Sequence, residues 1–383
     1  MQRCGDVYLV TGGNGFLGQQ IVKLLMKEME NLAEVRILDK LMNQDFVQFL
    51  EGAGYSEHLH FFKGDLRNKE LVQRACRGVT CVIHSASVID VWGYISKEEI
   101  ESINVEGTRL LLETCLQQNV KSFIYTSTVE VMGPNSRGDP IRNGDEDTIY
   151  PITLKFEYSK TKHRAEQLTL RSNGWLLPNG EKMITCALRP MYIYGEMSRF
   201  LVQHLDEAIN NGDVLVRSSK KEALVNPVYV GNVAWAHVLV AKAFKDPENI
   251  VGGQFYYITD DTTYMSYSDF NYKLMKPLGI QIESHLKMPL ILTYFIAFIQ
   301  EVFQFLMSPF FKYTPKIPRQ LITMLNTEFT FSSHKAYKDF GYTPRYSWEE
   351  ARQRTTAWLE SILQERRDVV KKKQQPCSPK HPK

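Results

Sequence analysis

Tyr158 and Lys162 are two residues whose types and spacing indicate proton chemistry. They lie four positions apart at the start of a segment with helical apolar spacing, so both side chains would share one helix face. A nearby ammonium favours a phenolate, and a phenolate can take an alcohol proton while hydride leaves for a nicotinamide ring. Because tyrosine and lysine often fall at this spacing by chance, the prediction needs support from other residues.

Three hydroxyl residues, Thr126, Ser127 and Thr128, stand where the strand expected over residues 123–126 ends. Strand ends at the carboxyl edge of a parallel sheet face the cofactor crevice. A hydroxyl group there can hydrogen-bond a substrate oxygen and fix its orientation. Spacing alone does not decide which of the three does so.

A glycine-rich turn follows the first expected strand. Gly12, Gly15 and Gly18 have the spacing G-x-x-G-x-x-G, and Phe16 and Leu17 complete the turn. The missing side chains permit a tight turn and bring the backbone close to a pyrophosphate at the start of a helix. We expect these five residues to bind a dinucleotide.

Asp39 ends the second expected strand, 21 residues after Gly18. A carboxylate there can accept hydrogen bonds from the adenosine ribose and would repel a 2′-phosphate, which favours NAD over NADP. The neighbouring Lys40 weakens that choice, and Asp39 can also be a solvated turn residue. Asp65, after the third strand, is a candidate for adenine contact or a turn residue.

Composition excludes several other classes of protein. The 46 Lys and Arg residues nearly balance the 43 Asp and Glu residues, so no overall field attracts nucleic acid. The six cysteines lack C-x-x-C or Cys/His spacing, which argues against disulfides and structural zinc; we expect reduced thiols and no metal. The N-terminus has no signal-peptide layout.

Alternating β-branched runs and helix-length segments predict an α/β fold with a doubly wound parallel sheet and a smaller C-terminal lobe. The expected strands are Val7 to Val10, Val35 to Leu38, Leu59 to Phe62, Cys81 to His84, Phe123 to Thr126 and Ile184 to Leu188. We expect a nucleotide-binding domain over residues 1–190, to which 225–242 return. Residues 191–224 and 243–367 would form the substrate lobe, with a last helix that a capping box opens at Ser347, and 368–383 a disordered basic tail.

An apolar stretch covers residues 288–311 and contains one charge, Glu301. Its length can reach across a bilayer core, but the charge and two prolines weaken that interpretation. The less apolar residues form one narrow helical stripe: Thr293, Ala297, Gln300, Glu301, Gln304 and Ser308. This predicts a helix that lies in a membrane interface or docks on its own protein with lipid on its apolar side; a helix buried in the lobe is the alternative.

Motifs along nearly the whole chain, from Val7 to Leu363, resemble the 3β-hydroxysteroid dehydrogenase/Δ5-to-Δ4 isomerase family of the extended short-chain dehydrogenases. They are Thr11 to Gly18, Val82 to Ala86, Ile89 to Val91, Asn104 to Thr108, Phe123 to Ser127, Glu130 to Ser136, Cys186 to Gly195, Asn226 to His237, Gly253 to Asp261 and Tyr346 to Glu350. The resemblance implies a Rossmann-type domain and NAD.

The resemblance also implies a reaction and its residues. The enzyme would oxidise the 3β-hydroxyl of a Δ5 steroid and then move the double bond into conjugation. The catalytic hydroxyl falls on Thr128, where the family more often has serine, and Tyr158 and Lys162 match directly. For the proton transfer of isomerisation, Asp260 and Asp261 are candidates by position, although an acidic turn is an equal alternative.

The implied surroundings are a steroid substrate, membrane lipid and a homo-oligomer. Family members associate with endoplasmic-reticulum and mitochondrial membranes, which would leave the catalytic domain on a reducing side. Lys371 to Lys373 can add attraction to anionic lipid, or belong to a solvated tail. Rival activities are a dehydrogenase without isomerase activity, one for C27 sterols, and a C4-carboxysterol decarboxylating dehydrogenase. A rival of another class is an NAD-binding membrane scaffold.

Overall fold

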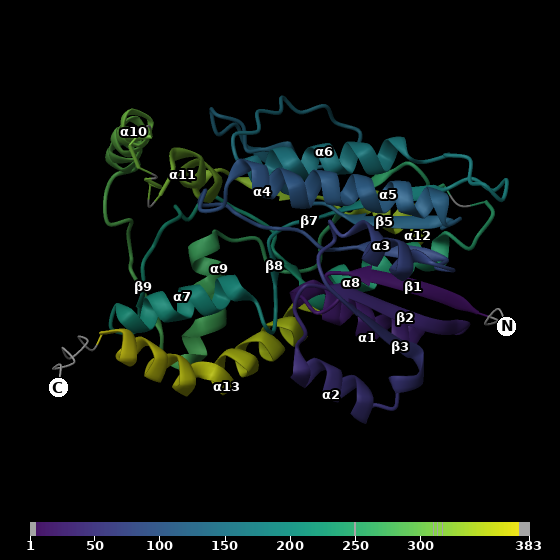
Figure 1. Ribbon diagram of the computed structural model, residues 1–383. Coiled ribbons are helices and arrows are strands. Elements are labelled where there is room, and N and C mark those ends of the chain that lie inside the picture. The colour runs from purple at the N-terminus through teal and green to yellow at the C-terminus, as the bar shows by residue number, and fades with distance from the viewer. Residues whose placement is uncertain (1–4, 249, 309, 312, 316, 375–383) are drawn as a thin grey trace, which may run out of the picture.

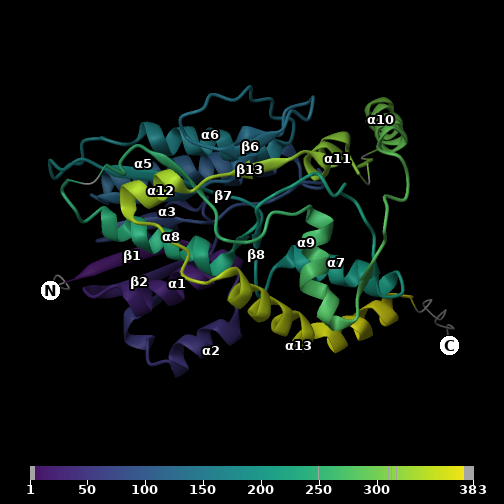
Figure 2. The ribbon, with the colours of Figure 1, turned by 180° about the vertical axis from the view of Figure 1, so that it is seen from behind.

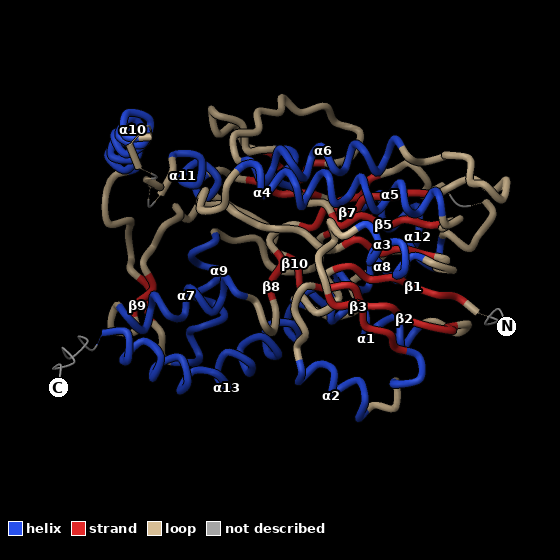
Figure 3. Tube along the Cα trace, in the orientation of Figure 1, coloured by secondary structure: helices blue, strands red, loops and turns tan. Residues whose placement is uncertain are grey.

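A seven-stranded parallel sheet forms the centre of the protein (Figures 1 and 3). The structure, a computed structural model, describes residues 5–248, 250–308, 310–311, 313–315 and 317–374. All six expected strands are present: β1 (Asp6–Thr11), β2 (Leu32–Asp39), β3 (Leu59–Lys63), β4 (Cys81–His84), β5 (Ser122–Thr126) and β7 (Ile184–Pro190). With β11 (Phe255–Ile258), their order is β11-β7-β5-β4-β1-β2-β3. The order reverses between β1 and β4, where such sheets bind ligands.

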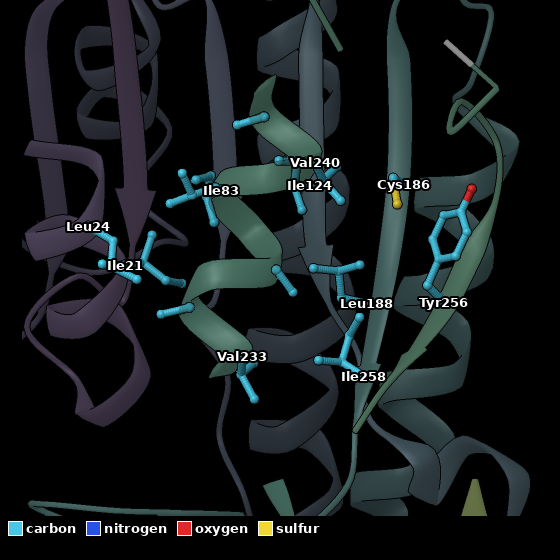
Figure 4. Close-up of a cluster of buried hydrophobic side chains, with 14 of the residues drawn as sticks. Ile21, Leu24, Ile83, Ile124, Cys186, Leu188, Val233, Val240, Tyr256 and Ile258 are labelled. Carbon is cyan, nitrogen blue, oxygen red and sulfur yellow. The ribbon is translucent and has the colours of Figure 1, made fainter. Parts of the chain in front are cut away.

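Helices cover both faces of the sheet, so its strands are buried on both sides. On one face lie α1 (Phe16–Glu28) and α8 (Val230–Ala243), which pack against Ile83, Ile124 and Leu188 (Figure 4). The opposite face carries α3 (Lys69–Cys76), α5 (Gly107–Gln117) and α6 (Glu157–Arg171). The described cysteines, Cys76, Cys81, Cys115 and Cys186, are buried free thiols in these two layers.

A smaller lobe packs beside the carboxyl ends of the strands (Figure 1). Its main helices are α7 (Arg199–Asn210), α9 (Tyr267–Met275) and α13 (Trp348–Gln374). Two short parallel pairs brace it: β8 (Ile193–Tyr194) with β10 (Val228–Tyr229), and β9 (Val214–Leu215) with β12 (Gln281–Ile282). Ser347 Oγ accepts a 3.3 Å hydrogen bond from Glu350 N, as the capping box predicts.

The remaining elements are shorter. They are α2 (Gln44–Gly52), α4 (Lys97–Glu101), α12 (His334–Phe340), β6 (Ile141–Gly144) paired with β13 (Phe329–Phe331), the 3₁₀ turns η1 (Ser56–His58), η3 (Val129–Met132) and η4 (Lys276–Leu278), and the π-helical turn η2 (Ser102–Glu106). In Figure 2, the view from behind, α12 and β13 lie in front of the central sheet.

The sequence misplaced two boundaries. Residues 255–258 form β11 and pair with β7, so the stretch 243–367 is not wholly a separate lobe. Its Phe-Tyr-Tyr-Ile residues bury in the sheet-side core, and α12 packs on the same layer. Residues 368–374 continue α13 as helix rather than a disordered tail; residues 375–383, like 1–4, lie outside the described residues.

The apolar stretch forms helix α10 (Leu290–Met307), which packs beside α11 (Arg319–Asn326) at the edge of the molecule (Figures 1 and 2). It is long and apolar enough to cross a membrane by length and composition. Only Ala297 on it is buried, which contradicts the alternative of a helix inside the lobe. The stripe from Thr293 to Gln304 is the less exposed side, while Ser308 is exposed.

Candidate active site

One cavity of about 1040 Å³ opens at the carboxyl ends of the central strands. The residues that directly follow β1, β4, β5 and β7 line it: Gly12, Ser85, Ser127 and Met191. Helices α6, α7, α9 and α11 supply its other walls. The cavity therefore joins the nucleotide side of the sheet to the substrate lobe.

The glycine turn lies at the cavity and has the conformation that the spacing predicts. Gly12 has φ of +69°, which favours glycine. A Cβ atom on Gly18 would stand 2.0 Å from the Gly12 carbonyl oxygen, so helix α1 can approach the turn only without that side chain. Gly15, Phe16 and Leu17 also line the cavity. The start of α1 thus faces space that fits a pyrophosphate.

Asp39 and Asp65 both reach the cavity wall. The Asp39 carboxylate accepts hydrogen bonds from Asn14 N (3.0 Å) and Leu41 N (3.1 Å), which hold it at the end of β2. Lys40 Nζ lies 2.8 Å from Asp65 Oδ2, so its charge is already paired. The hydrogen bonds from Arg67 lower the pKa of Asp65, and Lys40 adds to this effect, while burial opposes it. Asp39 thus stands at the end of β2, where a carboxylate can accept hydrogen bonds from an adenosine ribose, and Lys40 pairs with Asp65 instead.

Thr128, Tyr158 and Lys162 line the same cavity, so the structure brings the expected catalytic group together. Thr126 Oγ1 is 2.8 Å from His237 Nε2 and is therefore occupied elsewhere. Thr128 Oγ1 accepts from Glu130 N at 3.2 Å and keeps its own proton to donate. Ser127 Oγ is buried and has no hydrogen-bond partner among the described residues. Two of the three hydroxyl candidates remain.

The electrostatics of the tyrosine differ from the expectation. Burial, then the charge of Glu130, raises the pKa of Tyr158 above its ordinary value. Lys162 Nζ instead donates to Thr126 O (2.5 Å) and lies 4.2 Å from the centre of the Tyr125 ring. Burial lowers the pKa of Lys162 to about 7. These protein groups alone favour the neutral phenol, so a phenolate requires further positive charge.

Glu130 is a site residue that the sequence did not single out. It lies on η3, lines the cavity and has only part of its surface exposed. Ser159 Oγ donates to its Oε2 at 3.3 Å. Burial, opposed by that hydrogen bond, raises the pKa of Glu130 to about 7. The sequence did contain one indication of this role, because Glu130 lies only two residues after Thr128.

Asp260 and Asp261 do not reach the cavity among its described lining residues. Asp260 Oδ2 accepts hydrogen bonds from Tyr229 N and Asn232 Nδ2, both at 2.8 Å. Its Oδ1 accepts from Thr262 N at 3.0 Å, and Asp261 is exposed. This geometry supports the acidic-turn alternative, because the carboxylate of Asp260 closes the end of β11.

His84 and Asn104 organise the wall behind the cofactor side. His84 lies between two threonine hydroxyls, with Nδ1 2.6 Å from Thr11 Oγ1 and Nε2 2.9 Å from Thr108 Oγ1. Asn104 exchanges hydrogen bonds with the backbone of Val88 at 2.8 and 3.0 Å. Both side chains are buried. Their hydrogen bonds therefore go to neighbouring protein groups that support the wall of the cavity.

The doubly wound sheet, the glycine turn and the Thr-Tyr-Lys group define a short-chain dehydrogenase/reductase with a dinucleotide site. The family model described as the 3-beta hydroxysteroid dehydrogenase/isomerase family matches residues 9–290. The chain belongs to this family. It is therefore an enzyme of the dehydrogenase type, as the resemblance in its motifs implied.

Solved structures share the fold at low identity. The crystal structure of gox2253 is 24% identical, with a TM-score of 0.67 over 93% of this chain and 98% of that one. DesIV, a dTDP-glucose 4,6-dehydratase from Streptomyces venezuelae solved with NAD and TYD, is 19% identical, with a TM-score of 0.68 over 93% and 97%. MoeE5 in complex with UDP-glucuronic acid and NAD is 20% identical, with a TM-score of 0.67 over 93% and 99%. These likenesses confirm the fold class.

Proposed function

We propose that the protein uses NAD to oxidise the 3β-hydroxyl of a Δ5 steroid and then isomerises the product to the Δ4-3-ketone. The observation that carries the proposal is the meeting of Thr128, Tyr158 and Lys162 in one cavity with the glycine turn and Asp39. Family membership supports the steroid, and the NAD bound in the structures of DesIV and MoeE5 supports the cofactor.

The substrate side of the cavity supports a rigid apolar substrate. Side chains from several elements line it: Val91, Trp92, Met191, Tyr192, Phe200, Leu215, Val216, Leu321, Met324 and Leu325. The ring of Phe200 packs against two other aromatic rings: its centroid lies 5.8 Å from that of Trp92 and 6.1 Å from that of Tyr192. Such a wall gains free energy by burying a sterol skeleton.

Each protein group has a defined task in the oxidation. Thr128 and Tyr158 hydrogen-bond the substrate oxygen, and Tyr158 accepts the alcohol proton. Lys162, fixed by Thr126 O, holds the nicotinamide ribose. NAD when bound supplies the hydride acceptor and a positive charge, which offsets the burial that raises the pKa of Tyr158.

Incubation of the purified protein with pregnenolone and NAD tests the reaction. We expect NADH together with the ultraviolet absorption of a conjugated enone. NADH without the enone would remove the isomerase step and favour a dehydrogenase alone, and panels of C27 sterols and C4-carboxysterols would then identify its substrate. Absence of NADH with all of them would overturn the dehydrogenase proposal.

The Tyr158→Phe variant tests the mechanism and separates the enzyme from an NAD-binding scaffold. Loss of the phenol hydroxyl should lower NADH formation by about 100-fold or more, because general acid–base groups contribute that much. Binding of NAD, measured by fluorescence titration, should change little. Turnover equal to that of the unmodified protein would contradict the assigned role.

We further propose that α10 binds the membrane of the endoplasmic reticulum or mitochondrion. Its outer side exposes Ile291, Phe295 and Phe305, with 85%, 58% and 78% of their surface accessible. Its inner side is tied to α11, where Glu301 pairs with Arg319 at 2.7 Å. This arrangement fits a helix docked on its protein with lipid on the apolar side. The last turn of α13 carries Lys371 to Lys373 and lies at the same edge of the molecule as α10, well below it in Figure 1.

A further inference from the structure

Glu130 places a carboxylate beside the hydroxyl groups assigned to the substrate oxygen. It follows Thr128 by two residues, and η3 on which it lies packs against α6. Its Oε2 accepts from Ser159 Oγ at 3.3 Å, and Ser159 is the neighbour of Tyr158 in the chain. All of Thr128, Glu130 and Tyr158 line the cavity. The carboxylate therefore belongs to the reacting end of the site.

Steroid chemistry requires a proton carrier at this end. When the C3 oxygen lies at Thr128 and Tyr158, C4 is one bond away from C3, and C6 lies on the same edge of the ring system. A group that serves both carbons must stand beside the two hydroxyls. Asp260 and Asp261 are outside the cavity lining, whereas Glu130 is part of it.

We propose that Glu130 carries the proton from C4 to C6 of the Δ5-3-ketone; this inference rests on the proposed function. The carboxylate breaks the C4–H bond and becomes protonated, while the electron pair forms a dienolate with its charge on the C3 oxygen. Hydroxyl donors from Tyr158 and Thr128 stabilise that charge. Glu130 then returns a proton to C6 and the C4=C5 bond forms, so no net proton or electron is consumed.

The protonation states fit this sequence of steps. Burial raises the pKa of Glu130 to about 7, which suits a group that must both take and return a proton near neutral pH. Burial and Glu130 raise the pKa of Tyr158, so the phenol that has received the alcohol proton keeps it. A carboxylate base combined with neutral donors at an enolate oxygen is a known arrangement for isomerising ketosteroids.

The decisive experiment measures two half-reactions with one preparation of full-length protein. Isomerisation is assayed with the Δ5-3-ketone of pregnenolone and NADH, and dehydrogenation with pregnenolone and NAD. We expect Glu130→Gln to lower the isomerase kcat by about 100-fold or more and to lower the ratio of isomerase to dehydrogenase kcat by a similar factor. Glutamine still accepts the Ser159 hydrogen bond, so the local fold is preserved.

Matched variants complete the test. Glu157→Gln changes a carboxylate of α6 that pairs with Lys160 at 2.8 Å and does not line the described cavity. The ratio of isomerase to dehydrogenase kcat should be unchanged in this variant. Glu130→Asp should recover part of the isomerase rate. An unchanged ratio in Glu130→Gln would overturn the assignment to Glu130. Failure of the unmodified protein to convert the ketone would overturn the isomerase step itself and the role of Glu130 with it.

A pH profile gives a second readout. The titratable groups facing Glu130 are Tyr158 from α6 and Tyr267 from α9, and burial raises the pKa of both. Among these three side chains Glu130 is the one that titrates near 7, and the base must be ionised in the free enzyme. Burial also lowers the pKa of Lys162 in the same cavity to about 7, so a shift of the limb in a variant that changes the surroundings of Glu130 separates the two groups. Isomerase kcat/KM should rise with pH through about 7. Ser159→Ala removes a hydrogen bond to the carboxylate and should move that limb to higher pH; an unmoved limb would contradict the assignment.

Discussion

At the scale of single residues, the site exchanges stability for function at Lys162. Burial lowers the pKa of its ammonium to about 7, so at neutral pH and below the folded protein holds a charge that water would solvate better. The unfolded chain binds more protons than the native one between about pH 7 and the ordinary pKa of lysine, and stability rises with pH over that window. The penalty is thus greatest below pH 7.

The Lys162→Met variant should therefore be more stable than the unmodified protein at pH 6, by about 1–2 kcal/mol. The gain should shrink towards pH 10, because Lys162 is then neutral in the folded state. Urea denaturation at several pH values measures it. Lys160→Met, at a more exposed lysine paired with Glu157 at 2.8 Å, should show no such gain. A gain that grows with pH would contradict the cause.

The two hydroxyl candidates can be separated by substitution. Thr128→Ala should lower the dehydrogenase kcat by about 100-fold, since it removes a donor aimed at the developing charge. Ser127→Ala removes an unpartnered buried hydroxyl and should leave kcat within a few-fold while the fold gains stability. Steady-state kinetics with pregnenolone decide between them. The reverse pattern would assign the role to Ser127.

At the scale of elements, the sequence predicted what local pattern controls. β-branched runs between helix-length segments located six strands, and glycine spacing located the turn, because both depend on neighbouring residues. β11 was missed although Phe255-Tyr-Tyr-Ile258 consists of residues that favour strands, because its place in the sheet depends on pairing with β7, which lies far away in the sequence. The sequence could not compare Glu130 with Asp260 for a related reason: only the folded chain decides which carboxylate faces the cavity.

Helix α10 yields a prediction of its own. Replacing Ile291, Phe295 and Phe305 by serine removes apolar surface that would enter lipid, worth about 1.5 kcal/mol or more for each side chain. Binding to liposomes, measured by flotation, should weaken by at least about 100-fold. The control variant carries serine at Leu41, Ile149 and Leu176, which are 67%, 97% and 68% exposed and lie outside α10. It also replaces three exposed apolar side chains by serine and should leave liposome binding intact. Equal flotation of both variants would return α10 to a role within the protein.

At the scale of the whole molecule, one buried ion pair joins the catalytic helix to the sheet. Arg189 of β7 donates to Glu166 of α6 at 2.6 and 2.8 Å, and to Tyr257 of β11 at 3.2 Å. Both charged side chains are almost completely buried. The pair thus couples the position of Tyr158 and Lys162 on α6 to β7 and β11, the two neighbouring strands at one edge of the sheet.

Breaking this pair should destabilise the entire domain. Glu166→Gln leaves the Arg189 charge unpaired and should lower the free energy of unfolding by about 3–5 kcal/mol. Glu349→Gln breaks an exposed pair with Arg352, which water already screens, and should lower the free energy of unfolding far less. Urea denaturation measures both. Equal losses would show that the buried pair contributes no more than a surface pair.

The position of β11 late in the sequence has a consequence for the growing chain during translation. Strand β7 ends at Pro190, but the strand that covers its open edge begins at Phe255, so 64 residues separate them. Until Phe255 to Ile258 have left the ribosome, β7 is an unpaired edge strand of the nascent sheet. Such an edge is a template for aggregation. Truncated products that end before Phe255 should therefore precipitate, even though they contain the complete glycine turn and the Thr-Tyr-Lys group.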